Sequence, residues 1–429
     1  MGSVVTNYRF TLFLGGLAGV NIFVTFLIQW YVLITIGPGT ETDALFAAMA
    51  LPQFVLAVVS GSLMRVLVPL LAGEDEEQSR HDAWSFFILI GAIFSGLAVL
   101  LYSFAPFLVP FLVPGFSDNG KSLTVQLTRI QLIGMVFPAL SCVLWAASHA
   151  RRRFLWTELT QLLGSILGLG VLVWALPRYG IVGAAWVGVI RAILQTLLLL
   201  PAQGGYCKPN LDCAALGKAW YRMKPLLFGS VYYKTGPLVD RFLSSLTPVG
   251  GLSLLYFGQQ IYGSATQIMD RALVAPMVPL LAAHAKVGNP AIFQYIYRKQ
   301  LWRVTCLTGG GCLLLLLTGE PLFRLLLDHG DITGESLRLL WWIMVALMGF
   351  FIGSTVGQIL SSAFYAIGNT QTPTKVGVIG FTLGVLFKVV GFFRFGLLGI
   401  AMGTSLYYLL NVFALYILLE REHRDAVSR

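Results

Sequence analysis

Lys234 is a lysine near the middle of a long apolar stretch, about 10 residues from either end, where a charge cannot easily reach the membrane surface. A cation at that depth costs about 2.5–3.5 kcal/mol on insertion scales, so a retained one usually faces a partner or a water-filled cavity. The same helical face carries Ser230 before Lys234 and Pro237 and Arg241 after it, at steps of three or four residues. The stripe predicts a polar helix face on which Lys234 binds an anionic group.

Three other apolar stretches carry polar residues at the same rhythm, which is typical of helices that share a polar space. Together they predict a central water-filled cavity lined partly by cations. The stripes are Asn21, Thr25 and Gln29; Gln260, Ser264, Gln267 and Arg271; and Ser354, Gln358, Ser361 and Tyr365.

Each of these residues also has a plainer explanation. Arg65 and Arg271 lie toward the cytoplasmic ends of their helices and could extend to the lipid headgroups. Arg241 could pair with Asp240 at the outer interface. The serine and glutamine stripes could hold helices together rather than bind a ligand.

Lys234 could likewise neutralise a carboxylate such as Asp240 or Asp43 instead of binding a ligand. Asp43 stands near the start of the stretch from residue 37 to residue 72, which runs apolar for nearly thirty residues after it. We expect Asp43 at the membrane edge and include it among the candidate cavity residues.

The elements that carry these residues follow from composition. Of 429 residues, 57% are hydrophobic and 11% charged, and the mean hydropathy is +0.78. A soluble protein has about 25% charged residues. Apolar runs of about 20 residues recur along the chain and are long enough to cross a bilayer as helices. We therefore predict an all-α polytopic membrane protein.

Twelve spans can be placed, and they define alternating loops. The loops on one side carry most of the basic residues, among them Arg152, Lys208 and Arg298. Because positive loops stay in the cytoplasm, both termini are predicted to be cytoplasmic. The net charge of +10 is explained in this way, without nucleic acid as a partner. The spans are 10–36, 44–72, 84–112, 124–148, 156–176, 181–201, 222–246, 250–282, 302–327, 336–365, 374–393 and 397–419.

Two echoes in the sequence indicate an internal duplication. Residues 37–72 resemble residues 247–282, 210 positions later, and residues 179–185 resemble residues 395–401, 216 positions later. The longest polar interval lies between spans six and seven. We therefore expect two pseudo-symmetric six-helix lobes of parallel orientation around the cavity, with Pro69 equivalent to Pro279. The lobes are residues 1–203 and 225–429, joined by a cytoplasmic linker at 204–224.

Enzyme chemistry has little support in this sequence. It contains no nucleotide-binding loop, no His-Glu metal motif and no paired carboxylates on an outer loop. The five histidines are scattered at span ends or in loops, and the five cysteines lack metal-ligand spacing. No enzyme, cofactor or metal site is predicted, and coupling to an ion or to the membrane potential stays open.

Several short motifs, in order along nearly the whole chain, resemble the MviN/MurJ-type lipid II flippases. The motifs are Thr42-Asp43-Ala44-Leu45, Leu51-Pro52, Val68-Pro69-Leu70-Leu71-Ala72, Asp240 to Leu246, Gly251 to Tyr256, and Phe364 to Pro373. The resemblance implies a two-lobed exporter of the multidrug/oligosaccharidyl-lipid/polysaccharide superfamily. Such proteins move a polyprenyl-linked sugar from the cytoplasmic to the outer leaflet by alternating access.

This chain departs from the family pattern at three points. The family's Arg-Asp pair in its first helix falls on Ile28-Gln29, and the arginine of its eighth helix falls on Gln260. Relatives usually carry two further carboxyl-terminal helices beyond the twelve predicted here. A pyrophosphate would still need positive charge, which Lys234, Arg271 and Arg65 would have to supply.

We therefore expect a flippase of the bacterial cytoplasmic membrane for a polyprenyl-pyrophosphate-linked oligosaccharide, either lipid II-like or a polysaccharide unit. Envelope-biosynthesis proteins are conceivable partners. One alternative is a drug/cation antiporter of the same superfamily, although the first span lacks the carboxylate such exchange needs. A membrane glycosyltransferase would need a sizeable catalytic outer loop, and the outer loops are short. A non-transporting scaffold in envelope assembly is the third alternative.

The charge asymmetry of the loops predicts which residues a membrane-impermeant thiol reagent reaches. A cysteine introduced by Asp118→Cys, or one at Asp331, should be labelled on intact cells. Cysteines at Arg152 or Arg298, and the native Cys213, should be labelled only after permeabilisation. Labelling of Asp118→Cys only after permeabilisation would reverse the orientation.

Overall fold

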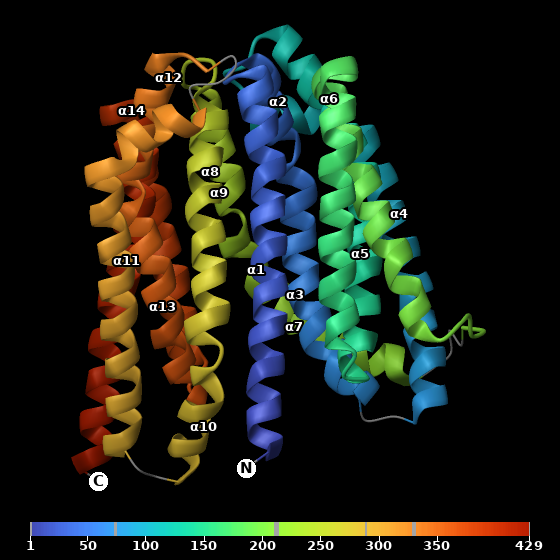
Figure 1. The fold of residues 1–429 in the computed structure, drawn as a ribbon, viewed down its shortest axis with the longest axis vertical. Coiled ribbons are helices and arrows are strands. Elements are labelled where there is room, and N and C mark those ends of the chain that lie inside the picture. The colour runs from blue at the N-terminus through green and yellow to red at the C-terminus, as the bar shows by residue number, and fades with distance from the viewer. Residues whose placement is uncertain (1, 73–74, 210–213, 288–289, 328–331, 429) are drawn as a thin grey trace. The chain divides into compact units, whose positions relative to one another are not determined.

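The computed structural model describes residues 2–72, 75–209, 214–287, 290–327 and 332–428, and these residues form helices and short connections (Figure 1). Contacts divide the chain into two units, Met1–Val249 and Gly250–Arg429. The α-helices of the first unit are α1 (Gly2–Ile36), α2 (Thr40–Ala48), α3 (Ala50–Ala72), α4 (Glu76–Leu112), α5 (Asp118–Ala150), α6 (Phe154–Leu199), α7 (Ala214–Lys234) and α8 (Gly236–Ser245), with the 3-10 helix η1 (Leu200–Gln203) between α6 and α7.

The second unit holds α9 (Gly251–Met269), the π-helical turn η2 (Asp270–Val274), α10 (Met277–Val287), α11 (Pro290–Leu327), α12 (Gly334–Ala346), α13 (Met348–Ala366) and α14 (Gln371–Ser428). The unit boundary at 249/250 differs from the linker expected at 204–224, because α7 and α8 pack on α3 and belong to the first unit. The two six-helix lobes, residues 1–203 and 225–429, therefore stay a prediction. The boundary between the packed units lies at 249/250 instead.

Several spans are broken where proline removes a backbone donor. Pro52 cannot donate to the carbonyl of Ala48, and α2 and α3 are separated there. Pro237 likewise follows the break between α7 and α8. In the second unit, the segments 251–274 and 277–285 are bent by 46° around Pro276. Lys234 is consequently the last residue of α7, at a helix end rather than within a continuous helix.

Eight stretches among the described residues are long and apolar enough to cross a membrane, and the bent pair adds a ninth. Two of the eight are longer than one crossing and fold back on themselves. α6 reverses at Gly180 (φ 57°, ψ −148°), and α14 reverses at Gly396 (φ 58°, ψ −131°). Each is therefore a helical hairpin with two arms, which brings the architecture close to the twelve spans expected from the sequence.

The arms of both hairpins approach closely at glycines, as helices do in membranes where small residues let backbones meet. A Cβ on Gly403 would lie 2.7 Å from the backbone nitrogen of Lys388, and one on Gly168 would lie 3.0 Å from the Arg191 side chain. The glycines thus set the spacing between the two arms and leave no room for a larger residue there.

The internal duplication is supported by backbone details that recur 216 positions apart. Ser117 and Thr333 each cap a helix by accepting a bond from the backbone N–H three residues later. The turns after Arg151 and Ile367 share φ −88°, with ψ of 10° and 5°. The hairpin glycines at 180 and 396 have the same separation and nearly the same dihedrals. The order α5–α6 is therefore repeated as α12–α13–α14.

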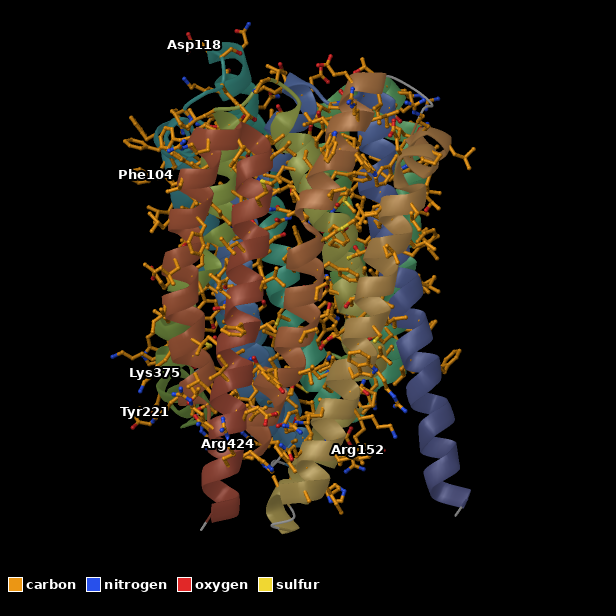
Figure 2. All side chains as sticks on the ribbon, turned by 90° about the vertical axis from the view of Figure 1, so that its left-hand side faces the viewer. Phe104, Asp118, Arg152, Tyr221, Lys375 and Arg424 are labelled. Atoms are coloured by element: carbon orange, nitrogen blue, oxygen red, sulfur yellow. The ribbon has the colours of Figure 1, made fainter. Side chains whose placement is uncertain are left out.

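The helix ends of the first unit agree with the loop charges. Asp118 lies at one end of the unit, and Arg152 and Tyr221 lie at the other (Figure 2). This follows from α5, which runs without a break from Asp118 to Ala150 between the two ends. The end that carries Asp118 is thus opposite the end that carries Arg152, as the loop assignment predicts. Asp331 and Cys213 lie outside the described residues.

Replacing the hairpin glycine should strain the second unit. Because Gly396 occupies a region of φ and ψ that side chains rarely adopt, Gly396→Ala should destabilise the protein by about 1–3 kcal/mol. Thermal unfolding in detergent measures the effect. Gly377→Ala, in α14 with open space around the added Cβ, is the control and should change stability little. Equal unfolding of the two variants would contradict the strained hairpin.

Candidate functional site

The first unit contains a partly open cavity of about 200 Å³ lined by α1, α2, α3, α5 and α6. Its lining from α5 lies between Gln131 and Pro138, near the middle of that helix. Most of the wall is aliphatic, from residues such as Val32, Leu56 and Leu172. In a mostly apolar wall, the few polar groups that reach the cavity determine what it can bind.

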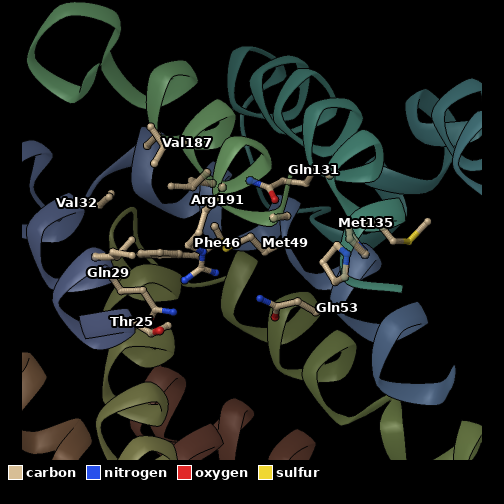
Figure 3. A pocket seen from close by; sticks show the side chains of 18 of the residues that line it. Thr25, Gln29, Val32, Phe46, Met49, Gln53, Gln131, Met135, Val187 and Arg191 are labelled. Atoms are coloured by element: carbon tan, nitrogen blue, oxygen red, sulfur yellow. The ribbon is translucent and has the colours of Figure 1, made fainter. Parts of the chain in front are cut away.

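The polar groups in the cavity are one guanidinium and four primary amides, with Thr25. Arg191 extends from α6 into the centre of the cavity, and its guanidinium ends between Gln29 and Gln53 (Figure 3). Gln131 reaches in from α5, and Gln195 lies one turn beyond Arg191. None of the described residues that line the cavity is acidic. The cavity is therefore positively charged.

Small residues make room for these side chains. Gly168, on the first arm of the α6 hairpin, lies directly against the methylenes of Arg191 on the second arm. Gly188 lies against the amide of Gln131. A side chain at either position would press on a polar cavity residue. The hairpin at Gly180 therefore positions Arg191 through the packing of its two arms.

A separate polar network connects α1 to both arms of α6. The side-chain amide of Asn21 donates to Gln161 Oε1 at 3.3 Å and accepts from the Ser165 hydroxyl at 2.8 Å. Gln195 Nε2 donates to the Gln161 carbonyl at 3.3 Å and contacts Ser165 Oγ at 3.5 Å. Gln195 belongs to both the network and the cavity, so the network orients one cavity residue.

The residues expected from the sequence in the first unit are distributed over three places. Gln29 lines the cavity, whereas Asn21 belongs to the network behind it. Lys234 is half-buried at the end of α7, close enough to the exposed Arg65 for their positive charges to repel. Neither Lys234 nor Arg65 lines the cavity.

Asp43 and Arg241 are both buried, at 3% and 2% exposure. Arg241 Nε donates to the Phe46 carbonyl at 3.3 Å, and Phe46 and Asp43 lie on the same short helix, α2. Arg241 is thus a buried contact between α8 and α2. Ser230, which shares the predicted stripe, has no described side chain.

In the second unit, Gln260 is half-buried on α9, Arg271 is exposed on the π-helical turn, and Gln358 is exposed on α13. Thr266 and Ser354, from neighbouring helices, have their hydroxyls 3.1 Å apart. This contact joins α9 to α13 within the unit, although Thr266 lies outside the predicted polar stripe of α9. The role of these residues in binding stays a prediction.

The sequence analysis did not identify Arg191, Gln53, Gln131 or Gln195 as site residues. A usable signal was present, since Gly188, Arg191 and Gln195 follow one another at steps of three and four in an apolar stretch. Gln131 also follows Thr124 and Thr128 at steps of four and three, whereas Gln53 has no such stripe. Only the packing of five helices brings them to one cavity.

The fold and site define a class of protein. The helices are those of a polytopic membrane protein, and the chain repeats the same backbone features 216 positions apart. A cavity within the helices of the first unit holds one arginine and four glutamines. These are the features of a secondary membrane transporter built from internal repeats.

The chain belongs to the family of the lipid II flippase MurJ, whose family model matches residues 33–427. It is 22% identical over 408 residues to the "Probable lipid II flippase MurJ" of Vibrio cholerae, covering 89% of this chain and 76% of the relative. It is 21% identical over 369 residues to the "Lipid II flippase MurJ" of Burkholderia cenocepacia, covering 80% and 70%.

Solved structures share the fold. The structure described as "Lipid II flippase MurJ, inward closed conformation" matches with a TM-score of 0.83 and 19% identity, over 97% of this chain and 87% of that one. An inward-facing multidrug resistance MATE family transporter of the MOP superfamily matches with a TM-score of 0.78 and 14% identity, over 97% and 95%. The expected family and fold class are confirmed.

The network around Asn21 predicts a structural role for that residue. Asn21→Leu removes two side-chain hydrogen bonds between α1 and α6, so it should lower the free energy of unfolding by about 1 kcal/mol. Thermal unfolding in detergent measures this. Thr25→Val, one turn along α1 at the cavity wall, is the matched control and should cost less. If Asn21→Leu unfolds at the same temperature as the unaltered protein, these hydrogen bonds do not stabilise the contact between α1 and α6.

Proposed function

We propose that this protein moves a polyprenyl-pyrophosphate-linked oligosaccharide of the lipid II class across the bacterial cytoplasmic membrane by alternating access. Membership of the lipid II flippase MurJ family supports this function. The observation that carries it to the residues of this chain is the Arg191 cavity, because its chemistry fits a sugar-pyrophosphate headgroup.

The headgroup presents two kinds of polar surface. A guanidinium such as that of Arg191 can bind phosphate oxygens with two parallel hydrogen bonds. Side-chain amides such as Gln29, Gln53 and Gln131 both donate and accept, so they suit the hydroxyl and amide groups of sugars. The aliphatic remainder of the wall keeps competing water low and strengthens the charged contact. About 200 Å³ accommodates only part of such a headgroup, so the rest of the headgroup would lie outside this cavity.

Arg191 also offers a reason why this chain can lack the family's first-helix arginine. The family's Arg-Asp pair falls on Ile28-Gln29, and both residues line the same cavity as Arg191. A guanidinium supplied by α6 would place positive charge beside the position that α1 leaves neutral. In this interpretation the positive charge that the family carries on its first helix is supplied here by α6, in the same cavity.

Lys234 and Arg65 form a second positive pair in the first unit, and we propose that they contact the pyrophosphate at another stage of transport. Two cations that repel each other are stabilised when an anion lies between them. Arg271, Gln260 and Gln358 are proposed contacts from the second unit, and Asp43 with Arg241 would hold α2 in place. Both termini are proposed to be cytoplasmic, from the loop charges.

A cation antiporter would use the cavity differently. Exchange of a drug cation for a proton needs a carboxylate that can change its charge. The described lining of the cavity offers a guanidinium instead, which would repel such a substrate. Transport of an anionic headgroup is therefore the function that the cavity favours.

The test is translocation of a fluorescent lipid II analogue in vesicles containing the purified protein. Arg191→Gln should reduce the rate at least about tenfold, because the loss of one charge-assisted contact is worth about 1.5–3 kcal/mol. Arg191→Lys should retain part of the rate, since it keeps the charge but not the fork. Arg178→Gln, at the turn of the α6 hairpin, is the control.

Three results would contradict parts of the proposal. Normal transport by Arg191→Gln would remove the cavity from the mechanism. Normal transport by Lys234→Gln would show that Lys234 is not needed to bind the pyrophosphate and would leave Arg191 as the proposed contact in the first unit. No translocation by the unaltered protein, with uptake of a cationic dye instead, would favour an antiporter, whereas neither activity would favour a scaffold.

A further inference from the structure

A second positively charged site lies away from the transport cavity, at the end of the first unit where α3, α5 and η1 end and α4 and α6 begin. Arg80, Arg151 and Arg153 come together there around η1. Arg153 Nη1 donates to the Ala202 carbonyl at 2.7 Å, Arg151 Nη1 to the Gln203 carbonyl at 3.2 Å, and Arg80 Nη2 to the Gly204 carbonyl at 2.6 Å. Three guanidiniums thus bind three successive carbonyls.

These contacts use only part of what the guanidiniums can donate. Arg151 Nε and Nη2 and Arg80 Nε are buried without a hydrogen-bond partner. The Ser79 hydroxyl, in a residue only 2% exposed, is also without one. Buried donors are normally satisfied, so a group of them at one place indicates a ligand that accepts several hydrogen bonds.

The unused donors of Arg151 and Ser79 surround a pocket of about 310 Å³ at the ends of α3, α4 and α5. It is lined by Leu71, Ala72, Glu76, Ser79, Ala150, Arg151 and Arg153. Glu76 is the one carboxylate among these described residues, against two guanidiniums, with Arg80 beside them. Burial lowers the pKa of Arg151, and the charge of Arg153 lowers it further. A bound anion would raise the pKa of Arg151 again, because a nearby negative charge favours the charged guanidinium.

Arg153 also belongs to a second, apolar groove of about 500 Å³. The groove is lined by Arg152, Arg153, Phe154, Leu155, Trp156, Leu159, Pro201 and Ala202. Phe154 and Leu155 are each 36% exposed and Trp156 is 41% exposed. Tryptophan and arginine beside exposed aliphatic side chains are typical of the membrane interface. The polar pocket and the apolar groove therefore meet at one arginine.

We propose that this end of the first unit is a binding site for an anionic phospholipid. The phosphate lies in the polar pocket, accepting hydrogen bonds from Arg151 and Ser79, and an acyl chain lies along the groove formed by Leu155 and Leu159. Arginine binds phosphate oxygens with several directed hydrogen bonds, and basic pockets between membrane helices bind acidic lipid headgroups. The apolar groove favours a lipid over a soluble phosphate compound.

The bound lipid would also act as a structural tie. Its phosphate would join the turn between α5 and α6 to the start of α4, while the same arginines hold η1. Residues on either side of η1 belong to α6 and to the connection toward α7. Acidic lipid is therefore expected to stabilise the first unit as well as to occupy it.

The test uses the purified full-length chain in detergent, titrated with phosphatidylglycerol or with phosphatidylcholine. Bound lipid is counted by native mass spectrometry, and thermal unfolding is followed in parallel. Phosphatidylglycerol should bind at least about tenfold more tightly than phosphatidylcholine and raise the melting temperature. Equal affinity for the two lipids would overturn the proposal.

Variants assign the binding to this site. Arg151→Gln should weaken phosphatidylglycerol binding about tenfold or more, and Ser79→Ala should weaken it severalfold while leaving the carbonyl contacts of the arginines in place. Arg178→Gln, an exposed arginine at the hairpin turn of α6 and thus at the far end of its first arm, should have no effect. If Arg151→Gln fails to fold, Ser79→Ala decides, and unchanged binding by Ser79→Ala then refutes the pocket.

The groove separates a lipid from a soluble ligand. Leu155→Ser with Leu159→Ser should weaken phosphatidylglycerol binding and leave any binding of glycerol 3-phosphate unchanged. Tight binding of glycerol 3-phosphate or inorganic phosphate, with no effect of the groove variant on phosphatidylglycerol, would show a soluble phosphate site and overturn the lipid assignment. Because lipid binding is the readout, the result is independent of whether the protein translocates lipid II.

Discussion

The constraint on which this structure depends is that the interior of a membrane offers no water to polar groups. Every polar side chain within a span must therefore find a partner in the protein or open into a polar space. Asn21 bonds to residues of α6, and Arg191 lies in a cavity with four glutamines. The same requirement gathers polar residues from distant parts of the sequence into a few places within the bundle.

The hairpins of α6 and α14 show how closely backbone and function are connected. A reversal at one glycine lets two arms pack through further glycines, and in α6 that packing sets the position of Arg191. The cavity thus depends on Gly168 and Gly180, neither of which carries a functional group. Pro52 and Pro237 also shape the helices, because each lies just after the end of one helix, α2 or α7, and near the start of the next.

The repeated backbone carries different chemistry in its two copies. The turn after α5 holds Arg151, Arg152 and Arg153, and Arg152 adopts a φ of 57°. The equivalent turn after α13 holds Ile367, Gly368 and Asn369; Gly368 has a φ of 81°, and the Asn369 amide donates to Glu422. One geometry therefore supports a basic cluster in the first unit and a neutral, internally satisfied turn in the second.

The sequence by itself determined the class of fold, because apolar runs of membrane length permit only helices. The order of its residues also shows the basic loops and the repeated motifs. It also identified Gln29, which lies on a regular polar stripe. Only the tertiary structure decided that Asn21, on the same stripe, is bonded to α6, and that Arg191, Gln53 and Gln131 share a cavity. The physical reason is that a stripe specifies a helix face, whereas the partner of that face depends on how glycines and prolines let other helices approach.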